Sequence, residues 1–259
     1  MSTQLVISSR YNGPARSANG GYAAGSLAAA VLAAELRPDA TVEVTLRRPP
    51  PLETPMTLTW QHGGGRLEVP DGLVAEARVV DEDPAAVDPV EPDVAAAAML
   101  RYPGLTNHPF PRCFSCGPDR DAGDGLRIFP GRVEDAIDEP GEVPRPRVAA
   151  TWTPDATVAE DFHAYADGQP RVSVPVTLAA LDCVGGWAGD LEERLMVLAR
   201  MTARLDSLPV IGEEHVVVGM GRGRDGRKAW TSSTLYDVDG RVVGSAEHLW
   251  IAVDPATFA

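Results

Sequence analysis

Two similar stretches, GGYAAG at Gly20–Gly25 and GGWAG at Gly185–Gly189, indicate that one fold unit is used twice in this chain. Each lies among small and apolar residues, and each is followed by sequence rich in predicted strands. A glycine pair at the start of a helix lets a ligand approach free backbone N–H groups. We therefore expect each pair to begin a helix, and each helix start to offer a binding site.

The first unit is predicted over residues 1–81. A short strand over 4–8 precedes an Ala-rich helix over about 20–36, which Pro38 ends. The apolar pattern then changes to a period of two, which is typical of half-buried strands. These strands are predicted from Thr41 onward and over 56–61, 66–69 and 73–80.

The second unit is predicted over residues 147–259 with the same order of elements. Its strands are expected over 148–153, 196–205, 215–220, 229–237 and 241–253, and its helix, shorter than the first, from the second glycine pair onward. Residues 82–146 are predicted to be a connector that holds a short helix over 95–101, capped by Asp93, and a long loop rich in Gly and Pro.

Composition narrows the classes of function. The chain of 259 residues has 37 acidic and 23 basic residues and a formal net charge of -14, which disfavours nucleic acid as a partner. No apolar run approaches the roughly 20 residues of a membrane span, and residues 1–10 lack a basic region followed by an apolar core, so we expect no targeting segment. We expect no membrane association. Three cysteines favour a reducing compartment over a disulfide framework, so we expect a cytoplasmic protein.

Two further motifs, a cysteine pair and a Gly-rich stretch, resemble known binding motifs. Cys113 and Cys116, with His108 nearby, have the spacing of half a zinc site. Because a second pair is absent and Cys183 is remote in sequence, we expect a buried turn with two free thiols, no metal and no cofactor. The stretch GRGRDG over 221–226 matches a dinucleotide fingerprint, but it falls in a predicted hairpin and not between a strand and a helix.

The order of a strand, a small-residue helix and an antiparallel meander, present twice, resembles the hotdog fold in its double form. The fold class is therefore expected to be α+β, and the chain is similar to the thioesterase-like superfamily that includes acyl-CoA thioesterase II. This resemblance implies catalysis by an Asp near the beginning of the second unit's helix, a Thr or Ser on the following strand and a Gln on the last strand. Asp182 matches the Asp, His248 occupies the Gln position, and Thr202 is the hydroxyl nearest to the remaining one, which falls near Ala199.

The resemblance and the local sequence together give three candidate catalytic residues. Asp182 could activate a water that attacks a thioester carbonyl, or it could cap the second helix. Asn19 could hold a substrate carbonyl or cap the first helix, while the N–H groups of Gly20 and Gly21 could stabilise an oxyanion. His248 could assist Asp182, or it could be an ordinary, partly buried strand histidine.

The remaining candidates are assigned to substrate binding at the two helix starts. Tyr22 and Trp187 occupy matching positions and could fill the core or contact a ligand. Basic residues at Arg47 and Arg48, and over 222–228, could contact the phosphates of a CoA-type ligand. The substrate-binding residues predicted on this basis are Gly20, Gly21, Tyr22, Gly185, Gly186, Trp187 and Thr202.

The sequence therefore supports three functions. The first is hydrolysis of an acyl-CoA or acyl-carrier thioester, with the acyl thioester as the small-molecule partner. The second is binding of an acyl or CoA ligand without turnover, or a role as an interaction module. The third is a hydratase or dehydratase reaction that uses Asp182 and His248 as a pair. A homodimer is possible, since hotdog units pair, but two units in one chain satisfy the same pairing.

Overall fold

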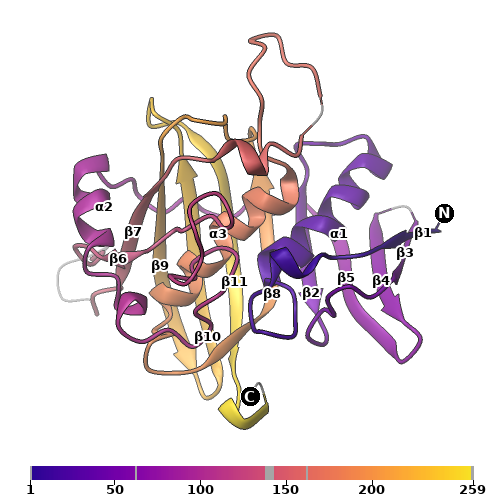
Figure 1. The fold of residues 1–259 in the computed structure, drawn as a ribbon, viewed down its shortest axis with the longest axis horizontal. Helices are drawn as coiled ribbons and strands as arrows, with labels where there is room; N and C mark the ends of the chain where they lie inside the picture. The colour runs from indigo at the N-terminus through magenta and orange to yellow at the C-terminus, as the bar shows by residue number, and fades with distance from the viewer. Residues whose placement is uncertain (1, 62, 138–142, 162, 258–259) are drawn as a thin grey trace.

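The computed structural model describes residues 2–61, 63–137, 143–161 and 163–257. Within these residues the strands form one antiparallel sheet of eleven strands. Two helices, α1 (Gly20–Glu35) and α3 (Val174–Ala188), lie side by side against one face of this sheet in the middle of the molecule (Figure 1). Their buried residues form one core with the inward-facing residues of the sheet.

The sheet contains the same strand order twice. From the edge of the sheet to its centre, the first half runs β1–β3–β4–β5–β2. From the centre to the opposite edge, the second half runs β8–β11–β10–β9–β7, with β6 beyond it, so it has the order of the first half in reverse. Strands β2 and β8 pair in the centre, where Val42 lies opposite Ala203, and this pairing joins the halves. The predicted repeat of strand order is confirmed, and the two expected sheets are continuous.

Most predicted strands occur close to their expected positions. Those of the first half are β1 (Ser2–Leu5), β2 (Thr41–Leu46), β3 (Met56–Gln61), β4 (Gly64–Val69) and β5 (Gly72–Val80). Those of the second half are β6 (Gly131–Arg132), β7 (Arg147–Trp152), β8 (Met196–Leu205), β9 (His215–Asp225), β10 (Lys228–Tyr236) and β11 (Val242–Ala252). The GRGRDG stretch forms the β9–β10 hairpin, as expected, and so has no dinucleotide-binding context.

The prediction for the start of the second helix is wrong. Helix α3 begins at Val174, with Pro175 in its first turn, and Gly185, Gly186 and Trp187 form its last turn. The apolar run before the glycines is itself helical, and Pro is well suited to the first turn of a helix. The second glycine pair therefore ends a helix, whereas the first pair begins one.

The glycines at the start of α1 allow close contact between the two helices. A Cβ atom on Gly21 would lie 2.5 Å from both the Cβ of Asp182 and the carbonyl oxygen of Leu178. A Cβ on Gly25 would lie 2.6 Å from the Cα of Pro175. The GGYAAG stretch is therefore required for packing of α1 on α3.

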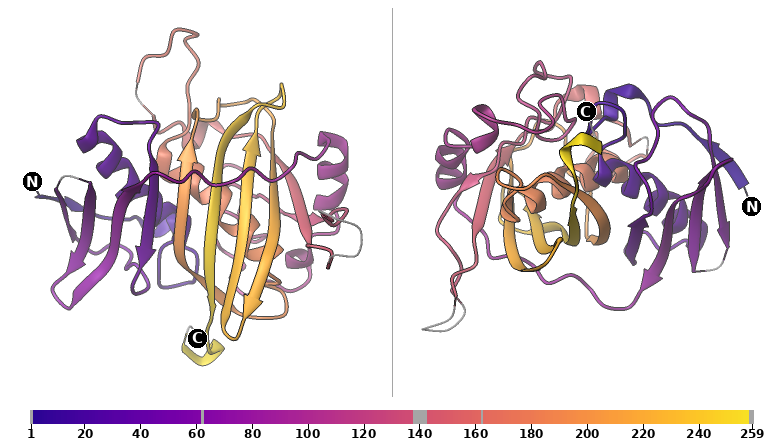
Figure 2. Two further views of the ribbon diagram at one scale, coloured as in Figure 1. Left: turned by 180° about the vertical axis from the view of Figure 1, so that it is seen from behind. Right: turned by 90° about the horizontal axis from the view of Figure 1, so that it is seen from below.

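The connector between the halves lies on both sides of the sheet. Residues 81–91 cross the outer face of the second half (Figure 2), where the Val87 N–H donates to Thr234 Oγ1 at 2.9 Å. Residues 103–137 lie on the helix side, where Phe114 is buried with its ring edge against Tyr11 and Tyr22. The division into 1–81, 82–146 and 147–259 stays a prediction.

The smaller helices complete the described structure. Helix α2 (Pro92–Met99) packs on β7, and its N-cap is Glu91, so Asp93 lies in the first turn and is not the cap. Short 3-10 helices are η1 (Ser9–Tyr11), η2 (Pro103–Leu105), η3 (Ala156–Val158) and η4 (Pro255–Thr257). Within the described ranges, no helix is both long enough and apolar enough to cross a membrane.

Candidate active site

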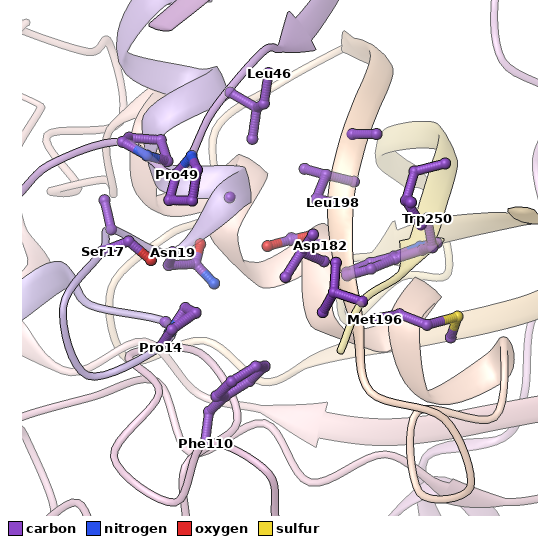
Figure 3. Close-up of a pocket in the computed structure, with 18 of the residues that line it drawn as sticks. Pro14, Ser17, Asn19, Leu46, Pro49, Phe110, Asp182, Met196, Leu198 and Trp250 are labelled. Carbon is purple, nitrogen blue, oxygen red and sulfur yellow. The ribbon is translucent and has the colours of Figure 1, made fainter. Parts of the chain in front are cut away.

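A cavity of about 520 Å³ lies where the start of α1 meets the middle of α3 (Figure 3). This volume is in the range of small-molecule binding sites. Its lining is mainly apolar, and two polar side chains, Asn19 and Asp182, project into the same space from the two helices. The apolar lining includes Pro14, Ala18, Leu46, Pro50, Phe110, Met196, Leu198 and Trp250.

Asn19 is the N-cap of α1. Its Oδ1 accepts a hydrogen bond from the Tyr22 N–H at 2.8 Å, which is the usual bond of an N-cap side chain. Its Nδ2 lies 3.5 Å from the Sγ of Cys183 and 3.8 Å from the Sγ of Cys113. The capping alternative is therefore correct, and the amide also lies on the cavity wall.

Asp182 lies in the middle of α3 and is 2% exposed. The sequence suggested that Asp182 could cap its own helix. The structure contradicts this, because α3 begins eight residues earlier, at Val174. Its Oδ2 accepts the Gly21 N–H of α1 at 2.8 Å. Its Oδ1 has no hydrogen-bond partner among the described residues. One oxygen thus holds the start of α1, and the other is a buried acceptor that the described residues leave without a partner beside the cavity.

Burial raises the pKa of Asp182 to about 7, although the Gly21 N–H and the Asn19 side chain oppose this shift. A buried carboxyl is raised in this way because its charged form has lost the solvation of water. A group with a pKa near neutrality can both accept and release a proton at physiological pH, as general acid–base catalysis requires.

The two glycines at the start of α1 differ in what they offer a ligand. The N–H groups of a first helical turn have no partner within the helix. Because Asp182 accepts the N–H of Gly21, that group does not face a substrate, so the predicted two-glycine oxyanion site is wrong in this respect. Gly20 lines the cavity and is the remaining backbone donor at this helix start.

His248 is on the other side of α3. Its Nδ1 lies 3.3 Å from Thr231 Oγ1, and a Cβ on Gly185 would lie 2.7 Å from that nitrogen. Burial lowers the pKa of His248 to about 4, so the imidazole is neutral at pH 7. Asp182 is not among the groups that shift this pKa. Among the described residues that line the cavity, His248 is absent. The strand-histidine alternative is the one that fits.

The other predicted binding residues lie outside the cavity. Gly185 and Gly186, at the end of α3, pack against His248 and Trp250 of the sheet. Trp187 packs on the rings of Tyr102 and His108. Tyr22 stacks on Tyr11 with ring centroids 3.9 Å apart.

Thr202 is on the outer face of the sheet. It lies opposite Glu43 of β2 and Glu247 of β11. These three residues line a shallow groove on the side away from the helices. Because the sheet separates this groove from α1 and α3, Thr202 cannot contact a ligand in the cavity. The assignment of Thr202 to substrate binding is therefore wrong.

Three buried cysteines form a wall of the same cavity, which the sequence did not predict. The Sγ atoms of Cys113 and Cys183 are 3.6 Å apart, and those of Cys113, Cys116 and Cys183 all lie within 4.8 Å of one another. Hydrogen bonds from the thiols of Cys116 and Cys183 lower the pKa of Cys113. Cys183 follows Asp182 directly, which is the one sequence signal that could have placed it here.

The rim of the cavity carries three exposed arginines, Arg47, Arg48 and Arg227. The first two follow strand β2, and the third lies in the β9–β10 hairpin. Arg47 forms an ion pair with Glu76, and Arg48 donates to the carbonyl of Asp71. The two basic stretches noted in the sequence, far apart along the chain, thus reach one opening.

Several solved structures have a similar fold, and the similarity covers nearly the whole of this chain. A conserved hot dog-fold protein of unknown function from Alicyclobacillus acidocaldarius is 12% identical, with a TM-score of 0.61, 98% of this chain covered and 94% of that one. For the acyl-CoA thioesterase II TesB2 of Mycobacterium marinum the values are 9%, 0.54, 99% and 94%. For the dehydratase domain of a mycocerosic acid synthase-like polyketide synthase they are 13%, 0.58, 97% and 90%.

The chain therefore has the double hotdog fold, as the resemblance in the sequence implied. Both halves of the sheet and both helices are included in the similarity, because the matches cover almost the full length. The sequence matches no protein-family model and no curated protein. The fold admits more than one reaction, so the function has to be argued from the cavity.

Proposed function

We propose that the protein hydrolyses an acyl thioester in the cavity between α1 and α3. The observation that carries this proposal is Asp182, a buried carboxyl with one oxygen held by the Gly21 N–H and the other without a partner among the described residues. An orienting bond on one oxygen fixes the carboxylate, so the second oxygen can act on a water at a defined position.

In the proposed reaction, Asp182 Oδ1 removes a proton from a water while the oxygen of that water attacks the thioester carbonyl. The carbonyl oxygen becomes an oxyanion, and the N–H of Gly20 at the positive end of α1 stabilises it. The tetrahedral intermediate then collapses, the C–S bond breaks, and the thiolate leaves with the proton that Asp182 took. The products are a carboxylic acid and a thiol.

The shape and charge of the cavity agree with a thioester that has an apolar end and an anionic end. Leu198, Met196 and Trp250 provide the apolar surface for an acyl group. The guanidinium groups of Arg47, Arg48 and Arg227 at the rim can pair with phosphates. A similar fold in the acyl-CoA thioesterase II of Mycobacterium marinum supports CoA as the carrier.

The central test is hydrolysis of a panel of acyl-CoA esters of different lengths, followed by release of free thiol. Asp182→Asn keeps the size of the side chain and an oxygen for the Gly21 N–H, but it removes the base. We expect turnover to fall by about 10²–10⁴-fold, the usual contribution of a general base. Asp206→Asn, at an exposed carboxylate that pairs with Arg204, is the matched control and should keep full activity. Unchanged turnover in Asp182→Asn would exclude this mechanism.

The carrier is tested with the arginines at the rim. Arg227→Ala should raise the KM for acyl-CoA by roughly 3-fold, as expected for loss of one exposed charge contact. The KM for the same acyl group on N-acetylcysteamine, which has no phosphate, should not change. If both substrates respond equally, the arginine contributes to the structure of the rim and does not recognise the carrier.

The other two functions predict different results in the same assays. A binding protein would be stabilised by acyl-CoA in thermal unfolding and would release no thiol from any ester in the panel. A dehydratase would use an Asp–His pair, and the described structure has no such contact between Asp182 and His248. The hydrolytic proposal is preferred to both, because Asp182 lines the cavity and its Oδ1 has no partner among the described residues.

A further inference from the structure

Cys113, Cys116 and Cys183 converge at one point although the chain separates the first two from the third by about seventy residues. The first two are in a tight turn, where the Cys113 N–H donates to the Phe110 carbonyl and the Gly117 N–H donates to the Cys113 carbonyl. The third is on α3. All three are buried.

The spacing of the three sulfur atoms fits a tetrahedral metal ion. Zinc–sulfur bonds of about 2.3 Å at tetrahedral angles place neighbouring sulfur atoms ~3.8 Å apart. The Sγ atoms of Cys113 and Cys183 are 3.6 Å apart, and all three lie within 4.8 Å of one another. Closure of the other two distances by at most about 1 Å would suffice for a common ion.

Each sulfur also has a polar N–H group beside it. The Nδ2 of Asn19 lies 3.5 Å from Cys183 Sγ and 3.8 Å from Cys113 Sγ. The Nε2 of His108 lies 3.3 Å from Cys116 Sγ. Donors of this kind stabilise metal-bound thiolates and orient them.

The tautomer of His108 decides its role. Its Nδ1 accepts the Phe110 N–H at 2.9 Å, so in the neutral ring the proton is on Nε2. A protonated Nε2 donates to the Cys116 sulfur and cannot bind a metal at the same time. The cluster is therefore a set of three sulfur ligands with an imidazole donor beside it.

We propose that Cys113, Cys116 and Cys183 bind one Zn²⁺ ion as thiolates. The three thiols release their protons on binding, and the fourth position of the tetrahedron is left to a water or to a ligand atom from the cavity that these residues line. Soft thiolate ligands in a buried set of three favour zinc over magnesium or calcium. The expectation of a metal-free turn is thereby replaced, because it depended on Cys183 being remote.

The ion would attach the connector to the second helix. Among the described residues, no backbone–backbone hydrogen bond joins the turn at 110–117 to α3, and the metal would link them next to Asp182 and the N-cap Asn19. Binding energy of a structural metal is folding energy for the segments that it joins. Removal of the ion should therefore loosen the cavity wall that the turn forms.

The test is the metal content of the full chain, purified without chelators and measured by mass spectrometry of the elements. We expect one zinc per chain, and after exchange, one cobalt with the sulfur-to-cobalt charge-transfer absorption of a thiolate site. Cys183→Ser should lower the zinc content at least several-fold. Ser115→Ala is the matched control, since its buried hydroxyl has no partner among the described residues and lies between the two cysteines of the turn.

Two results would overturn the proposal without reference to any variant. One is intact protein that takes up no zinc or cobalt. The other is a Cys113–Cys183 disulfide, found by mass spectrometry of the unreduced chain.

His108→Gln should lower zinc affinity about 10-fold, as for loss of a donor to a metal ligand, and keep the stoichiometry. Complete loss of zinc from a folded His108→Gln would contradict the three-sulfur ligand set. Because these readouts do not use hydrolysis, they stand apart from the proposed reaction.

Discussion

The two central helices differ at their starts. Helix α1 begins at the cavity, where Asn19 accepts the Tyr22 N–H and Asp182 accepts the Gly21 N–H. Helix α3 begins at Val174, the side chain of its N-cap Ser173 makes no capping bond, and no described residue of its first turn lines the cavity. One helix therefore supplies its N-terminus to the site, and the other supplies a carboxylate from its middle.

The glycine pairs differ in the same way. Those of α1 let it approach α3, since a Cβ on Gly21 would meet the Asp182 Cβ and a backbone oxygen. Those of α3 let the sheet approach the helix, since Gly185 and Gly186 face His248 and Trp250. The duplicated fold has kept glycine for close packing while the contact that requires it has changed. A shared motif in two halves of a chain is thus evidence of shared packing demands more than of shared chemistry.

Alanine at one glycine of each pair tests this difference most strongly. Gly21→Ala puts a Cβ against backbone atoms that cannot rotate away, so we expect a loss of about 3 kcal/mol in the free energy of unfolding, at the upper end for overpacking. In Gly186→Ala the Cβ meets the Trp250 ring at 3.0 Å, which can shift slightly, and alanine favours helix by about 1 kcal/mol. The two effects nearly cancel. Urea unfolding of both variants gives the comparison.

Equal losses in the two variants would contradict this assignment of the glycines. Gly212→Ala would not serve as a control, because Gly212 has a φ of 81° and alanine would be strained there. Ala29→Gly, on the half-buried side of α1, is a better reference. It measures the cost of glycine in a helix without any close contact, which is about 1 kcal/mol.

The histidine that packs against the second glycine pair should make stability depend on pH. His248 has a pKa of about 4 in the folded chain, whereas unfolded histidine titrates near 6.5. As pH falls, the unfolded state therefore binds a proton before the folded state does. The stabilising contribution of neutral His248 is complete above pH 6.5 and is lost as pH falls below this value. Between pH 7 and pH 5 this one residue should remove about 2 kcal/mol of the free energy of unfolding.

The measurement is urea unfolding at several pH values for the natural chain and for His248→Gln. The variant should lose less stability over this range, because glutamine does not titrate. Burial and the Thr231 contact are the only influences on the pKa of His248, so no second charge needs correction. Parallel pH dependences in the two proteins would mean that His248 is accessible to solvent in the folded state.

The sequence was sufficient for much of the fold. Period-two alternation located strands such as 56–61 and 196–205 without error, and repetition gave the strand order of both halves. Asn19 was correctly considered as a cap, because Asn before a helix has a local meaning. The second helix was misplaced, because glycines favour helix starts and ends alike, and the run over 174–181 has Thr177 as its one polar residue, so no polar side reveals its period.

The site depends on contacts between distant segments, which local patterns do not contain. Nothing near Asp182 indicates that its oxygen accepts an N–H from Gly21, and nothing near Cys113 indicates Cys183. Both contacts follow from the close packing of α1 on α3 and of the connector on both helices. The sequence left open whether His248 assists Asp182, because period two does not give the face of a strand, and in the structure this residue packs on Gly185.

The smallest expected effect compares the two N-caps directly. Asn19→Ala removes a capping bond and should cost about 1 kcal/mol of stability. Ser173→Ala removes a bond from Ser173 Oγ to Glu160, which is partly exposed, and should cost roughly 0.5 kcal/mol or less. The two variants should also differ in turnover. Asn19→Ala should lower it, because Asn19 lines the cavity and positions Gly20, whereas Ser173→Ala should not, because Ser173 does neither. Thermal unfolding and acyl-CoA hydrolysis of the same two variants check both statements. If Ser173→Ala lowers turnover as much as Asn19→Ala, the start of α1 has no special place in the site, and the oxyanion donor must be sought elsewhere on the cavity wall.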